Sequence, residues 1–194
     1  NHTIVKREGM TSTDISNAYQ SNMFAANIDI TGSDAGRIAK LADVINQVIT
    51  AMENYKDDNN KFVDMSGVKR IVTGNNPHVK AAINAALTLD CFKQGEAMVP
   101  NEAYQRATLE VTPYLNELPA IKFDATHHNF GFFIVDPTYN AENHGPEFTE
   151  RIPFTLDVTE TKRPKGVIYD GRQRFDINVA SWRGIVYVHI GGTQ

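Results

Sequence analysis

Histidine and carboxylate side chains supply the first candidates for chemistry in this sequence. His127 and His128 follow Asp124, and a Gly-Pro dipeptide separates His144 from Glu147. Zinc takes three or four nitrogen, oxygen or sulfur ligands that rigid elements hold in place. Adjacent histidines point to opposite sides of an extended chain, and no known metal motif surrounds His144. Solvated loop histidines are therefore the favoured interpretation.

Three other short patterns also fall short of a reactive site. Residues 57–60 are rich in Asp and Asn, but the calcium loop of an EF-hand needs Gly at its sixth position, where this chain has Phe62. Gly74 opens a turn into a helix that could hold a phosphate, yet Pro77 removes one of the donors, so helix capping explains it better. Cys91 is expected to be a small buried hydrophobe. The sequence thus assigns no catalytic, cofactor-binding or metal-binding residue.

The composition bounds the class of protein. The chain has 194 residues, a formal net charge of −4, 22% charged and 41% hydrophobic residues, which is typical of one soluble globular domain or two small ones. Basic and acidic residues are balanced in both halves, so no tail is built for nucleic acid or a membrane surface. No apolar run approaches the roughly 20 residues that span a bilayer. A single cysteine excludes an internal disulfide and any zinc cage built from cysteines.

The first half of the chain is predicted to be mainly helical. Residues 1–34 show no sustained period and are expected to form an extended arm. Apolar residues then recur at steps of three and four, which predicts an amphipathic helix from Ser33 to Tyr55. A short strand is expected over residues 68–73, followed by a helix that Asn76 caps and that runs to about Cys91. Residues 93–105 are expected to form a loop or a protruding hairpin.

The second half is predicted to be mainly β-structure, since 13 of the 18 aromatic residues lie beyond residue 98. Strands are expected over residues 107–114 and 130–136. Residues 152–159 and 175–179 alternate apolar and polar side chains with the period of a strand. Both faces of residues 182–190 are apolar, which predicts a central strand covered on two sides. The expected class is α+β, with one domain over residues 35–194 and an antiparallel-rich sheet.

The order of these elements and several short phrases resemble the C-terminal half of tailed-bacteriophage major capsid proteins, most of all the Mu-type major head subunits. The phrases are "YKDDNN" after the long helix, "VKRIVTG", "NPHVKAAINAAL", "LEVTPYL", "FGFFIVDP", "GPEF" and the run that ends "WRGIVYVHIGG". The similarity covers roughly residues 35–192. Residues 1–34 are too short to supply the N-terminal arm, extended loop and long spine helix that precede this region in the family.

The resemblance implies the phage-capsid fold and a structural role. An apex subdomain, made of a helix–strand–helix unit and a sheet, would cluster around the local symmetry axes, and a peripheral subdomain with long strands would meet neighbouring subunits. The chain would form pentamers and hexamers of an icosahedral head that encloses double-stranded DNA without sequence-specific contacts. It would assemble in the host cytoplasm, reside in the virion, and meet scaffold, portal or decoration proteins. It would not be an enzyme.

Two alternatives stay open. The phrase "MENYKDDNNKF" resembles the helix-to-loop junction of pilins, although residues 31–33 interrupt the hydrophobic N-terminal helix that a pilin needs. The second alternative is a small metal-dependent enzyme that gathers Asp136, Glu147 and the histidines in one cleft. Metal content of the purified protein would separate this alternative from the two assembly hypotheses.

Overall fold

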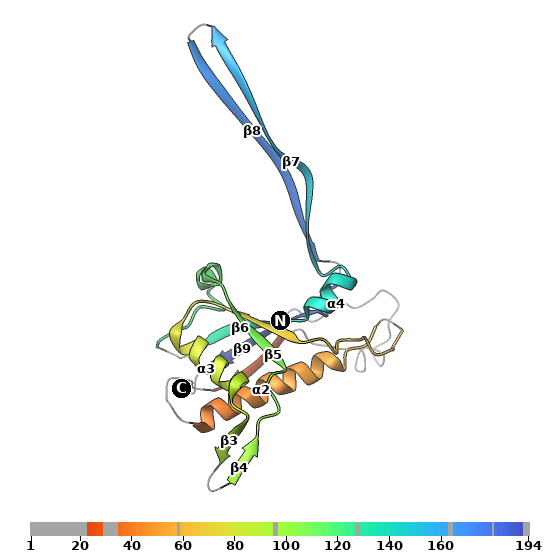
Figure 1. The fold of residues 1–194 in the computed structure, drawn as a ribbon, viewed down its shortest axis with the longest axis vertical. Coiled ribbons are helices and arrows are strands. Elements are labelled where there is room, and N and C mark those ends of the chain that lie inside the picture. Colours follow the sequence, from red (N-terminus) through yellow and green to blue (C-terminus); the bar gives the residue numbers. More distant parts are fainter. Residues whose placement is uncertain are drawn as a thin grey trace.

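The computed structural model describes residues 23–28, 35–57, 59–94, 97–126, 129–162, 165–179 and 181–191. Its class is α+β, as predicted, with a body of helices and a sheet from which a long hairpin projects (Figure 1). The helices of the described part are α2 (Ala35–Glu53), α3 (Pro77–Thr88), α4 (Pro137–Glu142) and the 3₁₀ helix η1 (Pro113–Glu117). Its strands are β1 (Met23–Asn27), β2 (Lys69–Thr73), β3 (Cys91–Gln94), β4 (Ala97–Pro100), β5 (Ala107–Val111), β6 (Phe130–Val135), β7 (Pro146–Lys162), β8 (Lys165–Val179) and β9 (Ile185–Gly191).

A five-stranded sheet with the order β1-β9-β6-β2-β5 forms the centre of the body. β9 pairs with β1 and β6, so it is an interior strand, as its apolar sequence predicted. The sheet is mixed and not antiparallel-rich, because β1 is parallel to β9 and β2 is parallel to β5. A parallel pair needs a crossover connection, and α3 supplies it between β2 and β5.

The core lies on one face of this sheet. The fully buried residues of its two inner strands alternate along the chain and share this face: Val186, Val188 and Ile190 of β9, and Phe130, Phe132 and Ile134 of β6. On the other face, Tyr187 and Phe133 are half-buried, with ring centroids 5.5 Å apart. The Tyr187 hydroxyl donates a hydrogen bond of 2.6 Å to the Ala120 carbonyl, and burial raises its pKa. The cover predicted for both faces of β9 is thus complete on one face only.

Helix α2 carries the apolar face that its periodicity predicted. Leu41, Ile45, Val48 and Met52 are all buried and belong to the core cluster. The expected start of this helix at Ser33 lies outside the described residues. The helix ends two residues earlier than predicted, at Glu53.

The turn that follows α2 is held by one carboxylate. Asp57 Oδ1 accepts hydrogen bonds of 2.8 Å from the backbone N–H groups of Asn59 and Lys61. These bonds lower the pKa of Asp57, the bond from Lys61 contributing most. The Asp57 carboxylate thus stabilises the turn through Asx-type hydrogen bonds to the backbone.

Helix α3 begins as the sequence predicted. Asn76 Oδ1 accepts hydrogen bonds from the N–H groups of His78 (2.9 Å) and Val79 (3.3 Å), and Pro77 occupies the first turn. The helix ends at Thr88 and not near Cys91, because the backbone turns extended at Leu89. Cys91 instead opens β3, where it is half-buried, so its expected full burial is wrong.

The β3–β4 hairpin and the end of β5 can also be compared with the predicted ranges. β3 and β4 pair as a hairpin, which agrees with the protruding hairpin expected near residues 93–105. The strand expected to reach Tyr114 ends at Val111, and η1 begins at Pro113. Proline has a fixed φ and no N–H group, which suits the first turn of a helix.

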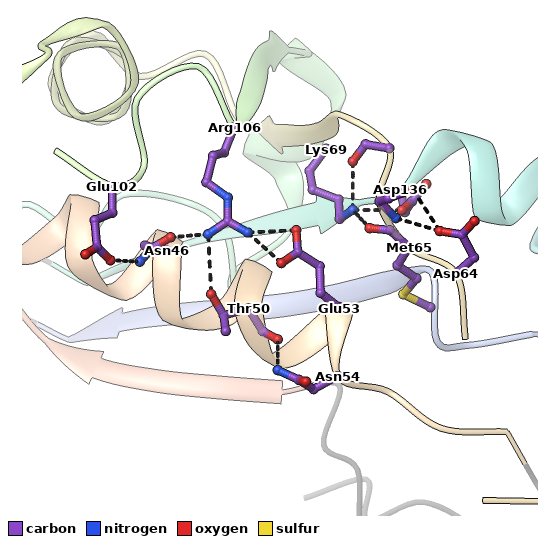
Figure 2. Close-up of polar contacts among 12 residues, drawn as sticks. Asn46, Thr50, Glu53, Asn54, Asp64, Met65, Lys69, Glu102, Arg106 and Asp136 are labelled. Carbon is purple, nitrogen blue, oxygen red and sulfur yellow. Dashed lines mark hydrogen bonds and ion pairs between the residues drawn. The ribbon is translucent and has the colours of Figure 1, made fainter. Parts of the chain in front are cut away.

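Arg106, just before β5, is fixed to α2 by its side chain (Figure 2). Its Nη2 atom donates to both oxygens of Glu53, at 2.7 and 2.6 Å, and Nη1 donates to Asn46 and to Thr50. Both terminal nitrogens of Arg106 are thus engaged by side chains of α2, one by Glu53 and the other by Asn46 and Thr50. This contact therefore sets the position of the sheet edge against α2.

Candidate functional site

Among the described residues that were candidates for metal binding, His144 and Glu147 form a pair. His144 Nδ1 lies 2.6 Å from Glu147 Oε1, but these side chains are 72% and 48% exposed. Asp124 accepts a hydrogen bond of 2.8 Å from the Thr126 N–H group. His127 and His128 lie outside the described residues. Within the described ranges, no group of three or more His, Cys, Asp or Glu side chains could hold a metal ion.

Asp136 takes part in a different contact, which the sequence analysis missed. Asp136 Oδ2 lies 2.9 Å from Lys69 Nζ, and both side chains are buried (Figure 2). The Lys69 ammonium also donates to the Met65 carbonyl and, at 2.7 Å, to the Gly67 carbonyl. Asp136 Oδ1 accepts a hydrogen bond of 2.9 Å from the Tyr139 N–H group, which caps α4. Groups of the protein itself surround this buried charge pair, which favours a structural role for it.

A signal for this pair exists in the sequence. Lys69 is in phase with Ile71 and Thr73, the two buried residues that follow on β2. Asp136 ends an apolar strand directly before Pro137, which is the pattern of a helix cap. β2 and β6 are antiparallel, with Arg70 opposite Val135. Lys69 precedes Arg70 and Asp136 follows Val135, so these two charged residues face each other at the strand ends.

The polar network continues from α4 to the two ends of the long hairpin. The Tyr139 hydroxyl lies 2.9 Å from Ser181 Oγ, and the Ser181 N–H group donates a bond of 3.1 Å to the His144 carbonyl. The Asn140 side-chain amide donates a bond of 3.0 Å to the Gly184 carbonyl. A side chain at Gly184 would overlap Asn140, so glycine is required there. These contacts fix where the hairpin leaves the body.

β7 and β8 form this hairpin, which we call the ribbon. It projects from the body beside α4, as the strands labelled β7 and β8 in Figure 1 show. Its strands have 17 and 15 residues. The alternation over residues 152–159 and 175–179 correctly predicted strands. Those strands belong to the ribbon, which is a separate two-stranded sheet, and not to the five-stranded sheet.

One face of the ribbon is apolar and exposed. Its nine largest apolar side chains are each between 49% and 67% exposed. We define an inner patch, near the body, of Phe148, Phe175, Ile177 and Val179. We define an outer patch, near the tip, of Phe154, Leu156, Val158, Val167 and Tyr169. Glu160, which is paired with Val167, lies on the same face at the outer edge of this patch. The rings of Phe148 and Phe175 stack with centroids 5.3 Å apart.

A polar pair separates the two patches. Gln173 Nε2 donates a hydrogen bond of 2.9 Å to Glu150 Oε1. The strand register shifts between Glu150 and Ile152 and again between Ile152 and Thr155. Such bulges bend a strand and increase its twist. The inner and outer patches are therefore distinct surfaces.

The opposite face of the ribbon is mainly polar, although it also carries the exposed side chains of Ile152 and Ile168. Arg172 forms an ion pair of 2.6 Å with Asp170 on the same strand, and both groups are exposed. Asp157 lies directly opposite Asp170, so Arg172 offsets the repulsion of two like charges. Thr149, Thr155 and Thr159 continue this face on β7. The ribbon is therefore amphipathic across its thickness.

A groove beside α2 and the Cys91 thiol are two further features with polar or reactive groups. A groove of about 430 Å³ lies between α2 and the β3–β4 hairpin, and its charged lining residues are Lys40, Asp43, Lys93 and Glu102. These charges are of both signs and favour no single ligand.

The Cys91 thiol donates a hydrogen bond of 3.3 Å to the Asp90 carboxylate. This hydrogen bond, together with desolvation, raises the pKa of the thiol. A raised pKa keeps the thiol protonated and unreactive.

The chain matches no protein-family model, and no curated protein matches it. No helix of the described segments is long and apolar enough to cross a membrane. The exposed apolar face of the ribbon is the most distinctive surface among the described residues.

Proposed function

We propose that this chain is a structural subunit that assembles with copies of itself into a closed shell, as the tailed-bacteriophage major capsid proteins that it resembles do. The observation that carries the proposal is the ribbon, which projects from the body and exposes nine large apolar side chains on one face. Under this proposal the body corresponds to the apex subdomain of the capsid fold and the ribbon to long strands of the peripheral subdomain.

The energetics of the ribbon support a partner surface. An isolated two-stranded hairpin is marginally stable in water, and packing on a third element is the usual remedy. Contiguous exposed apolar patches of several hundred square ångströms mark interaction sites. A period-two pattern arises where one face of a strand is covered. In the ribbon the described residues of the chain itself leave that face uncovered.

The polar residues fit the same role. The charged side chains with the deepest burial, Lys69 and Asp136, tie β2 to the cap of α4. The network of Tyr139 and Ser181 continues this tie to the ribbon ends. A shell subunit needs a rigid body and self-complementary surfaces. The charge of −4 suits the enclosure of DNA without tight, salt-sensitive contacts.

The test compares two substitutions at neighbouring positions on β7. Val158→Asp places a charge in the outer patch, whereas Thr159→Asp places it on the polar face. We expect the wild-type chain and Thr159→Asp to form closed particles with rising concentration, seen by light scattering and negative-stain electron microscopy. We expect Val158→Asp to stay monomeric with an unchanged circular dichroism spectrum. A wild-type chain that stays monomeric up to its solubility limit would contradict the proposal.

A further inference from the structure

We propose that β5 pairs edge to edge with β5 of a second copy of the chain and so extends the five-stranded sheet into that copy. The observations that carry this inference lie in the backbone of the body and not in the ribbon, so it goes beyond the proposed function. β5 (Ala107–Val111) is an edge strand, because β2 is its one partner strand in the described part of the chain.

Two hydrogen bonds fix which backbone groups of β5 face β2. The Lys69 N–H group donates to the Arg106 carbonyl at 3.3 Å, just before β5 begins. The Thr112 N–H group donates to the Thr73 carbonyl at 3.0 Å, just after β5 ends. In a parallel pair, every second residue directs both of its backbone groups at the partner strand. Between residues 106 and 112, the even-numbered residues therefore bond to β2.

The odd-numbered residues of β5 direct their backbone groups away from β2, to the free edge of the sheet. Thr108 and Glu110 use their N–H and C=O groups on β2, whereas those of Ala107, Leu109 and Val111 face this free edge. No proline removes a donor from the row. A row of unpaired backbone donors and acceptors is a template for another strand.

The side chains of β5 are complementary to a second β5 that runs antiparallel to it. With a two-fold axis at Leu109, this residue faces its own copy, Ala107 faces Val111, and Thr108 faces Glu110 of the second copy. Ala107 is buried and Leu109 packs against the core, so these pairs are apolar on the core side of the sheet. Thr108 and Glu110 are exposed on the other side, where their pairs are polar. Each cross-strand pair thus joins side chains of one kind.

Neighbouring registers are less favourable. An axis at Glu110 would place two carboxylates directly opposite each other, and like charges in that position destabilise a strand pair. An axis at Thr108 would place Val111 opposite Gln105, whose φ of 57° departs from the extended backbone of a strand. The axis at Leu109 has neither defect and pairs all the residues of β5.

The length of β5 sets the strength of the contact. Its five residues span about 17 Å at the rise of an extended strand. This contact is much smaller than the roughly 800 Å² that each partner buries in a stable interface. The dimer should therefore form at high protein concentration and dissociate in the dilute range in which particle formation is compared. A two-fold axis makes the contact isologous, so every cross-strand pair occurs twice.

The experiment measures amide hydrogen exchange in the full chain carrying Val158→Asp, so that particle formation does not compete with pairing. Mass spectrometry with electron-transfer fragmentation resolves single amides at low and at high protein concentration, and sedimentation gives the mass of the species. We expect exchange at Leu109 and Val111 to slow several-fold as the dimer forms. Thr108 and Glu110 are internal controls, because their N–H groups bond to β2 in the monomer as well.

Two substitutions at Thr108 test the register. Thr108→Glu places a carboxylate opposite Glu110 twice in the symmetric dimer, whereas Thr108→Lys places an ammonium group there. Because like charges oppose and unlike charges favour strand pairing, the dimer dissociation constant should rise about fivefold for Thr108→Glu and fall about fivefold for Thr108→Lys. Sedimentation equilibrium measures both constants, and circular dichroism shows whether each variant keeps the fold.

Several results would overturn this inference. One is a chain that remains monomeric at high concentration, and another is a dimer in which exchange at Leu109 and Val111 stays fast. Slow exchange of these two amides at low concentration would show that the chain itself covers the edge. Equal effects of the two Thr108 substitutions would exclude the register. Failure of the wild-type chain to form particles would overturn the proposed function and leave this pairing intact.

Discussion

The buried pair of Lys69 and Asp136 shows how a single charged contact can organise this molecule. Each group is desolvated, and each is compensated by the other and by backbone groups. Lys69 Nζ donates hydrogen bonds to the Met65 and Gly67 carbonyls and forms an ion pair of 2.9 Å with Asp136 Oδ2. The pair joins the start of β2 to the cap of α4, from which the ribbon extends.

Lys69→Met should destabilise the chain strongly. The substitution keeps much of the side-chain volume but leaves the buried Asp136 carboxylate without its counter-charge, so the free energy of unfolding should fall by about 3–5 kcal/mol. Urea denaturation measures it. Arg70→Met is the matched control, because Arg70 pairs with Glu110 at 3.6 Å and both side chains are 55% exposed. That change should cost less than about 1 kcal/mol. Equal losses would show that burial of Lys69 is not what matters.

Tyr55 predicts a dependence of stability on alkaline pH. Burial raises the pKa of its hydroxyl above the ordinary value of 10.0. The unfolded chain therefore ionises at lower pH than the folded chain. The contribution of Tyr55 to stability is complete below pH 10 and is lost as the pH rises above it. Urea denaturation from pH 8 to 11 should show a decline that Tyr55→Phe reduces and that Tyr114→Phe, at an 82% exposed side chain, leaves unchanged.

At the scale of elements, helix α3 is specified by local chemistry. The amide oxygen of Asn76 satisfies two N–H groups that the helix itself leaves unpaired. The helix then buries Val79, Ala82, Ile83, Ala86 and Leu87 against the core. Small alanines on this face allow close approach, and the helix carries the crossover between the parallel strands β2 and β5.

Asn76→Ala should lower the free energy of unfolding by about 1 kcal/mol, because the cap is lost while the helix keeps its packing. Thermal denaturation followed by circular dichroism measures the change. Asn75→Ala, at an exposed neighbouring position, is the control and should leave the melting temperature near that of the wild type. An unchanged melting temperature for Asn76→Ala would mean that the cap contributes nothing to stability.

At the scale of the whole molecule, the body holds the buried core and the ribbon holds the exposed apolar surface. Every residue of the buried core cluster lies outside residues 146–179. The ends of the ribbon, Pro146 and Val179, are paired partners, so a short turn can join them. Folding of the body should therefore not depend on the ribbon, whereas assembly should.

Replacement of residues 147–178 by Asn-Gly tests this division. The dipeptide favours the tight turn that connects adjacent antiparallel strands. The shortened chain should unfold cooperatively, with a melting temperature close to that of the wild type, and should not form particles. Calorimetry and light scattering measure the two properties. A shortened chain that does not fold would show that the ribbon is part of the body, and one that still forms particles would contradict a role of the ribbon in assembly.

The sequence by itself determined the elements whose signals are local. The period of α2, the cap of α3 and the alternation within β7 and β8 each depend on residues close together in the chain. Helix hydrogen bonds and caps join such near neighbours, so residue pattern is sufficient. The strand boundary at Pro113 also has a local cause that the pattern contained.

Only the tertiary structure decided which surfaces meet. The parallel pairing of β1 with β9, the contact of Lys69 with Asp136 and the exposure of the ribbon join or separate residues far apart in the sequence. An alternating strand has the same sequence pattern whether its apolar face packs on its own core or remains exposed. The period of two specifies which side chains share a face, but not what covers that face. The sequence thus predicted the amphipathic strands, and the fold placed their apolar side outside the core.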